Sequence, residues 1–62
     1  MTYKELIEEC KKRGFTIIDD NGKFSVLDKQ GKKHPLNSED MKKYKSGKEL
    51  VPSYFLELLD VL

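Results

Sequence analysis

The stretch FTIIDDNGKFSVL, residues 15–27, decides the fold of this chain of 62 residues. Its first part is aromatic and β-branched, which is typical of a β-strand. An Asn-Gly pair follows, and this pair is the strongest short sequence signal for a hairpin turn. Beyond the turn, the apolar residues Phe24 and Val26 alternate with polar ones, as in a strand with one buried face. We therefore predict an antiparallel hairpin with strands at residues 15–18 and 23–27.

An amphipathic helix is predicted immediately before the hairpin. Thr2 is a good N-cap residue, and Glu5 three positions later completes a capping box. Gly14 is typical of the position that follows the end of a helix. The apolar residues between these signals recur at helical spacing: Tyr3, Leu6, Ile7 and Cys10. The pattern predicts a helix over residues 2–13.

The residues after the hairpin predict a turn and a short third strand. Residues 28–31 read Asp-Lys-Gln-Gly, which is the composition of a turn with a late glycine. Residues 32–36 are suited to a short strand. Because proline has no backbone N–H to donate, Pro35 confines this strand to the edge of a sheet.

A short helix is predicted after the third strand. Either Asn37 or Ser38 can cap its N-terminus. It extends to Lys45, with Met41 and Tyr44 as its only apolar residues. With so few apolar contacts we expect a short element.

The last helix is predicted to begin at Pro52, since proline is favoured at the first helical position. Its core-facing stripe has the spacing i, i+3, i+4 and i+7: Phe55, Leu58, Leu59 and Leu62. The stripe is widened by Tyr54, Leu56 and Val61, so this tail holds more apolar residues than one helix face needs. Either the small core uses them all, or some remain for a partner protein or for a homodimer through this helix.

The order of the predicted elements is helix, strand, strand, strand, short helix, helix. This order favours the α+β class, with the two main helices packed on one face of a three-stranded antiparallel sheet. The length is that of one small domain, residues 1–62.

The composition indicates a globular protein with few core residues. Apolar and charged residues each make up 37% of the chain. Cys10 is the only cysteine, so no intramolecular disulfide can form, which is typical of a reducing compartment. The first residues lack the apolar run of a signal peptide, and the apolar tail at 54–62 is too short to span a bilayer. We expect a soluble cytoplasmic protein with no membrane partner.

Positive charge is concentrated in the middle of the chain. Residues 21–48 carry eight lysines against three acidic residues, a net charge of +5, whereas the whole chain has a net charge of +1. Residues 49–62 carry three acidic residues and no basic one. Such lysines can bind phosphate or an acidic protein face, although lysine is also a common solubilising residue. The candidate partner-binding residues are Lys23, Lys29, Lys32, Lys33, Lys42, Lys43, Lys45 and Lys48, together with Tyr44.

His34 is the only histidine, and so the only side chain whose ordinary pKa lies near 7. A ribonuclease needs a general base near the 2′-hydroxyl and cations near the phosphate. His34 beside Lys32 and Lys33 offers both, although a lone histidine in a basic edge strand is also a typical surface residue.

Other side chains give no sign of metal or cofactor chemistry. Cys10 lies on the apolar stripe of the first helix, where a free cysteine is usually a small buried residue. Asp19 and Asp20 precede an Asn-Gly pair, which fits turn chemistry better than a metal site. The chain has one cysteine and one histidine and no phosphate-binding or dinucleotide fingerprint, so we expect neither a metal nor a cofactor.

Two phrases of the chain match a known family at fixed spacing. One runs from Leu6-Ile7 to Gly14-Phe15, and the other reads Gly-Lys-Glu-Leu-x-Pro from Gly47 and continues into the leucine-rich helix. The turns at Asn21-Gly22 and Gly31-Lys32-Lys33 also align. Through these phrases the chain resembles the HicA-like toxin family, small domains of double-stranded-RNA-binding type that cleave mRNA. The resemblance covers nearly the whole chain and implies a helix–three strands–helix fold.

The chain departs from the family pattern in three places: after Gly22, at residues 37–45, which look like an insertion, and at Ser53, where the family has a glycine. HicA-like proteins carry a histidine in a Gly-Ser-His-type stretch, whereas Gly22 is followed here by Lys23 and Phe24. The resemblance therefore implies the fold without the family's catalytic histidine. We expect a non-catalytic protein that binds RNA or an acidic protein face, for example as an antitoxin partner or a phage-type inhibitor of a host or defence enzyme. The alternative is a ribonuclease toxin that uses the relocated His34.

Overall fold

The predicted hairpin is present in the computed structural model, which describes residues 1–62. Strand β1 (Thr16–Asp20) pairs antiparallel with β2 (Lys23–Leu27). The turn between them places Asn21 at φ 52° and Gly22 at φ 85°. A two-residue hairpin turn that matches the twist of the strands needs this left-handed backbone at both positions, which Asn-Gly adopts at little cost.

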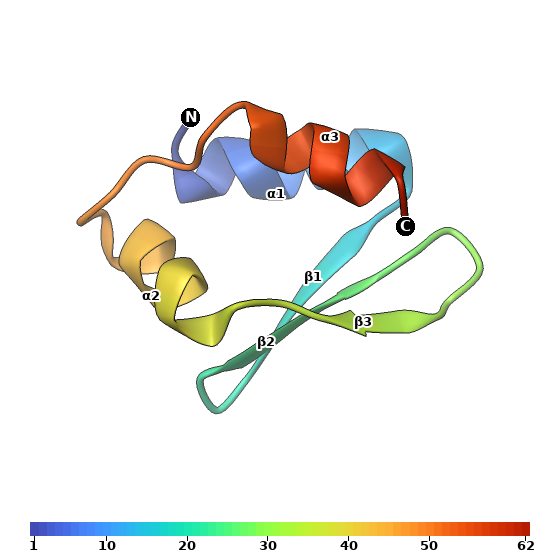
Figure 1. The fold of residues 1–62 in the computed structure, drawn as a ribbon, viewed down its shortest axis with the longest axis horizontal. Coiled ribbons are helices and arrows are strands. Elements are labelled where there is room, and N and C mark those ends of the chain that lie inside the picture. The colour runs from blue at the N-terminus through green and yellow to red at the C-terminus, as the bar shows by residue number, and fades with distance from the viewer.

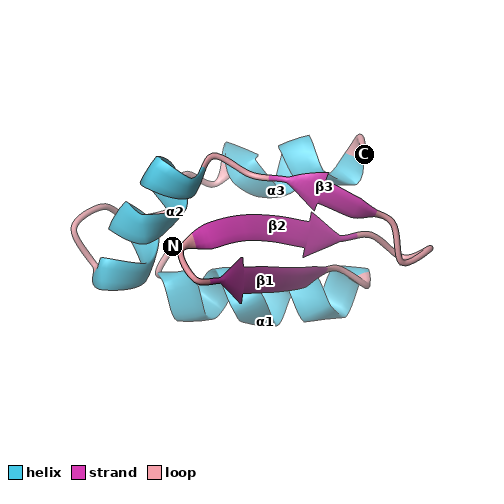
Figure 2. Ribbon diagram, turned by 90° about the horizontal axis from the view of Figure 1, so that it is seen from below, coloured by secondary structure: helices cyan, strands magenta, loops and turns pink.

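The third strand is present but short. Strand β3 (Lys33–Pro35) pairs antiparallel with β2, so the strand order is β1-β2-β3 (Figure 2). Pro35 is the last residue of this edge strand, where its missing N–H is tolerated because that position points away from the sheet. His34 lies opposite Val26, which is fully buried, so the histidine side chain lies on the face of the sheet that the helices cover.

Helix α1 (Tyr3–Arg13) has the predicted ends. Thr2 Oγ1 accepts a hydrogen bond from the Glu5 N–H at 3.2 Å, and the Glu5 carboxylate accepts one from the Thr2 N–H at 2.9 Å. These two bonds satisfy backbone donors that the first turn of the helix leaves free. Gly14 follows in the left-handed conformation and ends the helix.

Helix α2 (Ser38–Ser46) lies beside one end of the sheet (Figure 1). The Asn37 side chain caps it by accepting hydrogen bonds from two backbone N–H groups of the first turn. Its two buried residues are Met41 and Tyr44. The helix is attached to β2 by Ser38 Oγ, which accepts a hydrogen bond from the Phe24 N–H at 3.0 Å.

Helix α3 (Tyr54–Asp60) differs from the prediction in two ways. It begins after Pro52, whose carbonyl accepts a hydrogen bond from the Phe55 N–H at 3.0 Å in a tight turn that leads into the helix. The predicted core stripe is only partly buried: Leu59 is 2% exposed, whereas Leu58 is 55% and Leu62 52% exposed. The helix is only seven residues long; it packs against α1 and, through Phe55, against Tyr44 of α2, and Leu58 stays exposed.

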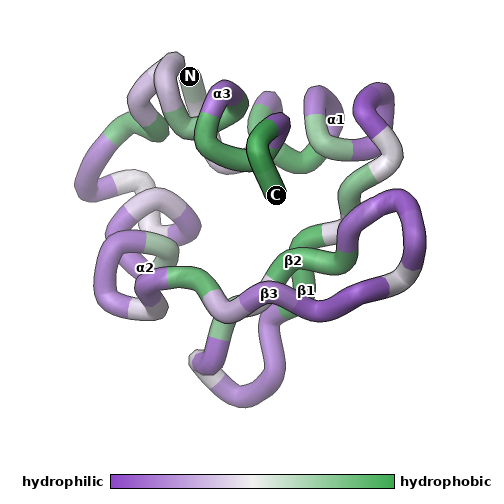
Figure 3. The backbone as a smooth tube through the Cα atoms, turned by 45° about the vertical axis from the view of Figure 1, so that its right-hand side comes forward, coloured by the Kyte–Doolittle hydropathy of each residue, from purple (hydrophilic) through white to green (hydrophobic).

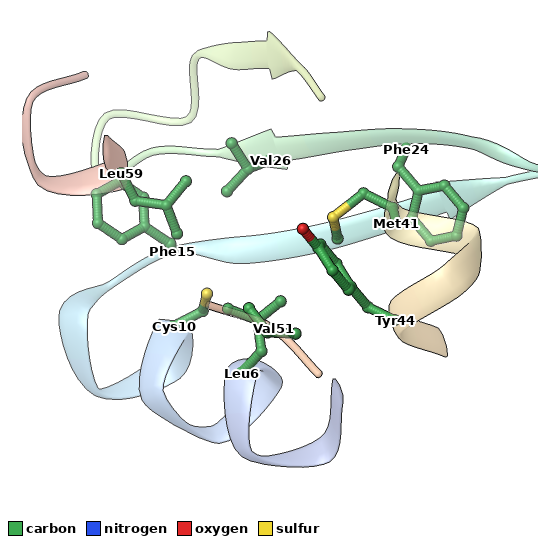
Figure 4. Packing of buried hydrophobic residues seen from close by; sticks show 9 residues of the cluster. All are labelled: Leu6, Cys10, Phe15, Phe24, Val26, Met41, Tyr44, Val51 and Leu59. Carbon is green, nitrogen blue, oxygen red and sulfur yellow. The ribbon is translucent and has the colours of Figure 1, made fainter. Parts of the chain in front are cut away.

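The helices α1 and α3 lie on the same face of the sheet, which confirms the α+β class and the two-layer arrangement (Figure 1). The core between the layers contains nine buried residues, which meet from all the helices and from β2 (Figure 4). They are Leu6, Cys10, Phe15, Phe24, Val26, Met41, Tyr44, Val51 and Leu59. With a core this small, each buried side chain carries a large share of the stability.

Hydropathy is unevenly distributed along the backbone (Figure 3). The C-terminal helix is mainly hydrophobic, whereas the segment between β2 and β3 is mainly hydrophilic. None of the three helices has the length and apolar character needed to cross a membrane.

Candidate binding surface

Three of the predicted lysines lie around the β1–β2 turn, and we call them the turn lysines: Lys23, Lys42 and Lys45. Lys23 directly follows Gly22 at the start of β2. Lys42 extends from α2 over the same glycine, since a Cβ built on Gly22 would lie 3.1 Å from Lys42 Cε. The fold thus brings together lysines that are about twenty positions apart in the sequence.

Asp19 organises the charges around this turn. Its Oδ1 accepts a hydrogen bond from the Gly22 N–H at 3.1 Å, and its Oδ2 forms an ion pair with Lys45 Nζ. The hydrogen bond from Lys45, followed by that from Gly22, lowers the pKa of Asp19, while the same ion pair raises the pKa of Lys45. Lys45 therefore holds α2 against the hairpin, and its charge is already partly compensated.

Three further lysines lie around the β2–β3 turn, at the opposite end of β2, and we call them the strand-end lysines: Lys29, Lys32 and Lys33. All three side chains are exposed. Lys29 folds back over Gly14, where an added Cβ would lie 2.9 Å from Lys29 Cγ. Lys33 is next to His34 in the strand, so the two side chains point to opposite faces of the sheet.

Asp28 fixes the backbone of the β2–β3 turn. Its Oδ1 accepts hydrogen bonds from the N–H groups of Gln30 and Lys32, each at 2.9 Å. Its Oδ2 lies 2.9 Å from His34 Nε2. The hydrogen bond with His34, then that from Lys32, lowers the pKa of the Asp28 carboxyl. The sequence analysis missed this pairing, although an acid at the first position of a tight turn that reverses a strand is a signal for it.

The predicted lysines differ in whether they form ion pairs with acidic side chains. Of the eight lysines between residues 21 and 48, Lys45 is paired with Asp19 and Lys43 lies 3.8 Å from a Glu49 oxygen. The other six form no ion pair. They are Lys23, Lys29, Lys32, Lys33, Lys42 and Lys48. Five of these six lie around the two turns at the ends of β2, and Lys48 follows α2. Unpaired, exposed ammonium groups of this kind can contact phosphates or carboxylates of a partner.

Tyr44 is a correction to the predicted site. The sequence predicts it as interface material, but it is only 8% exposed and belongs to the core. Its ring packs edge-to-face on Phe55, with centroids 6.3 Å apart, because the inner face of α2 has few other apolar side chains to bury. Phe24 is also buried, as expected. Neither of these two aromatic side chains is therefore available to stack on a base.

Side chains that could act as a nucleophile, a metal ligand or a general base are few and are not clustered. Cys10 is buried in α1, and burial raises the pKa of its thiol to about 11, which confirms the expected role as a small core residue. No three His, Cys, Asp or Glu side chains are placed to hold a metal ion together. His34 forms one ion pair, with Asp28, and both residues are partly buried.

Two of the three grooves in the structure lie away from the strand-end lysines. One, of about 720 Å³, lies between α1 and the chain after α2, with Lys4, Ile7 and Leu50 in its lining. The other, of about 260 Å³, lies between β3, α2 and α3 and is mainly apolar. The excess of apolar residues in the tail was the sequence signal for the second groove.

Comparisons of the chain with protein-family models, with curated proteins and with solved structures find no match.

Proposed function

We propose that this protein is a small non-catalytic domain that binds the phosphate backbone of RNA through its unpaired lysines. The observation that carries the proposal is that six exposed lysines between residues 21 and 48 form no ion pair. Exposed lysines that serve only solubility are commonly interspersed with acidic partners, as Lys43 and Lys45 are here.

The two lysine groups are separated along the sheet. Lys23 opens β2, and Lys33 lies opposite Leu27, the last residue of that strand. At a rise of about 3.4 Å per residue, these ends of β2 are about 14 Å apart. A partner that contacts both groups must therefore present negative charge over an extended surface, as a nucleic-acid backbone does.

The burial of the aromatic side chain of β2 supports one kind of RNA binding over another. Proteins that read single-stranded RNA usually stack bases on aromatic side chains. The aromatic residue of β2, Phe24, is buried beneath the helices. Contacts limited to phosphate and 2′-hydroxyl groups favour double-stranded RNA, which is recognised mainly by shape. The resemblance to HicA-like proteins supports the same class of partner.

An anisotropy titration with labelled double-stranded RNA tests this proposal. The titration is made at low and at physiological salt, with single-stranded RNA alongside, and the products are run on a gel. We expect binding to duplex that weakens steeply with salt and leaves the RNA intact. Replacing either Lys32 or Lys33 by glutamine should weaken binding and reduce the salt dependence by about one counterion for each phosphate that the variant no longer binds. Lys4→Gln is the matched control, since Lys4 is an exposed lysine on α1 outside both groups.

Two outcomes would contradict the RNA proposal. Equal loss of affinity in the Lys4→Gln control would show that only net charge matters. No binding at either salt concentration would indicate that the lysines bind an acidic protein face instead. That is the alternative expected for an antitoxin partner or an inhibitor of a host or defence enzyme.

The Asp28–His34 pair supports a second candidate function, cleavage of RNA by a relocated histidine. A carboxylate 2.9 Å from an imidazole nitrogen can orient a general base. However, His34 lies on the helix-covered face, while its neighbour Lys33 points to the other face. If cleavage does occur, His34→Ala should abolish it while duplex binding is retained. Cleavage that survives this substitution would exclude the histidine mechanism.

A further inference from the structure

One face of the sheet carries no helix, and we call it the open face. Helices α1 and α3 both lie on the other face (Figures 1 and 2). Phe24 and Val26 of β2 are buried beneath those helices. Because successive side chains of a strand point to opposite faces, Lys23, Ser25 and Leu27 lie on the open face.

The strand register gives the middle of the open face. Residues that lie directly opposite each other in neighbouring strands point to the same face. Ser25 lies between Ile18 of β1 and Pro35 of β3, and Lys33 of β3 lies opposite Leu27. The middle of this face therefore carries neither a long side chain nor a charge, so a flat partner surface can approach it closely.

Positive charge lies at both ends of the open face. Lys23 is at the end near the β1–β2 turn, and Lys33 is at the other end, about 14 Å away along β2. Both are exposed, and neither forms an ion pair. The one acidic residue on this face is Asp20, opposite Lys23. The charge pattern fits a partner with two rows of negative charge separated by an uncharged strip.

The hydroxyl of Ser25 lies between these two lysines. It forms no hydrogen bond within the protein, unlike the hydroxyls of Ser38 and Ser46. Ser25 is also only partly buried, so its hydroxyl can both donate to and accept from a partner. A ribose 2′-hydroxyl has the same two capacities, and it is the group that distinguishes RNA from DNA.

We propose that the open face lies across the minor groove of double-stranded RNA, where Ser25 contacts a 2′-hydroxyl while Lys23 and Lys33 contact phosphates on either side. This inference rests on the proposed function and adds to it the groove that is bound and the residue that selects RNA. The minor groove of an RNA duplex is wide and shallow and displays 2′-hydroxyls, which matches a flat face with a central hydroxyl.

The width of the sheet argues against the same contact with DNA. Neighbouring strands lie about 4.8 Å apart, so the two outer strands of this sheet are separated by about 10 Å. The minor groove of B-DNA is only about 6 Å wide. A DNA duplex therefore meets the lysines without admitting the middle of the open face, and Ser25 makes no contact with it.

Anisotropy titrations with an RNA duplex and a DNA duplex of the same sequence test the inference. Ser25→Ala should weaken RNA binding about 2- to 10-fold, the effect of one lost hydrogen bond, and leave DNA binding unchanged. The dependence of RNA affinity on salt should also stay the same, because no phosphate contact is lost. Ser46→Ala is the matched control, since its hydroxyl already bonds within α2, and it should bind both duplexes like the wild type.

A second pair of variants locates the bound face. Asp20→Asn removes the one negative charge from the open face and should tighten RNA binding, because that carboxylate repels phosphate. Glu8→Gln changes the net charge of the protein equally, at an exposed residue of α1 that forms no ion pair. It should therefore tighten binding less than Asp20→Asn does.

The outcomes separate this inference from the proposed function. RNA binding that is unchanged by Ser25→Ala, or weakened equally for RNA and DNA, would overturn the minor-groove contact while the wild type still binds RNA. Equal effects of Asp20→Asn and Glu8→Gln would overturn the assignment to the open face. A wild type that binds neither duplex would overturn the proposed function and this inference together, in favour of an acidic protein partner.

Discussion

The Phe24 N–H donates a hydrogen bond to Ser38 Oγ at 3.0 Å, and this bond links the start of β2 to the first turn of α2. Beyond the end of β3, no strand is available to accept a hydrogen bond from this part of β2. The Leu36 N–H makes the last bond of the ladder, to the Phe24 carbonyl. The Ser38 side chain thus takes the place of a missing strand residue.

We predict that Ser38→Ala destabilises the fold by about 1–3 kcal/mol, because it leaves the N–H of a buried residue without a partner. Urea denaturation followed by circular dichroism measures the change. Ser46→Ala is the control, since its hydroxyl bonds only to the Lys43 carbonyl and does so in an exposed position. Equal midpoints for wild type and Ser38→Ala would show that water replaces the serine hydroxyl.

The unequal burial of two leucines leads to a second prediction. Leu59→Ala, in α3, should cost about 2–5 kcal/mol, the range observed when a buried leucine is truncated. Leu50→Ala, at an exposed position before that helix, should change the free energy of unfolding by less than about 0.5 kcal/mol. Chemical denaturation of both variants checks this difference. Similar effects at the two sites would mean that α3 does not pack as described.

Acid should destabilise the protein through Asp28. Its pKa is lowered in the folded state by the hydrogen bonds from His34 and from the backbone. The ionised carboxylate therefore stabilises the fold at every pH above the ordinary aspartate pKa of about 4. This contribution is lost as the pH falls from there through the lowered folded pKa. Asp28→Asn keeps the size and turn geometry of the side chain but not the charge.

We therefore expect Asp28→Asn to be less stable than wild type at neutral pH and to lose less stability on acidification. Urea midpoints measured between pH 7 and pH 2 test this. Asp20→Asn is the control, since the Asp20 side chain is exposed and makes no ion pair, and it should leave the pH profile unchanged. A parallel profile for Asp28→Asn and wild type would contradict the role of this carboxylate.

The Cys10 thiol should be unreactive in the folded protein. It is buried, and its pKa is raised to about 11, so little thiolate exists at pH 8. A thiol reagent such as dithiobis-nitrobenzoate should label it only slowly under native conditions and rapidly in denaturant. Rapid native labelling would indicate that α1 detaches from the sheet on the timescale of the reaction.

The elements with strong local signals could be predicted from the sequence. The Thr2–Glu5 capping box, the Asn-Gly turn and Pro35 each act within a few residues, and the structure confirms all three. These features determine the α+β class and the order of the elements without knowledge of any long-range contact.

The features that depend on long-range packing could not be predicted. The spacing of apolar residues in the tail indicates a buried face of α3 but not how much of it α1 and the sheet cover. Likewise, the pattern of α2 does not indicate which lysines find acidic partners. Lys45 meets Asp19, 26 residues earlier, only because the hairpin turn and α2 lie at the same end of the sheet.

Pro35 has a consequence for the behaviour of the protein at high concentration. The Leu36 N–H donates to the Phe24 carbonyl of β2, and the Lys32 carbonyl accepts from the Asp28 N–H just after β2. Because the pattern alternates, the backbone groups of Lys33 and Pro35 point away from the sheet. A strand from another molecule that approached this edge would find only one backbone N–H donor, that of Lys33, because proline has no N–H. Growth of the sheet into fibrils is therefore obstructed on the β3 side, and β1 is the edge through which any amyloid-like assembly would have to begin.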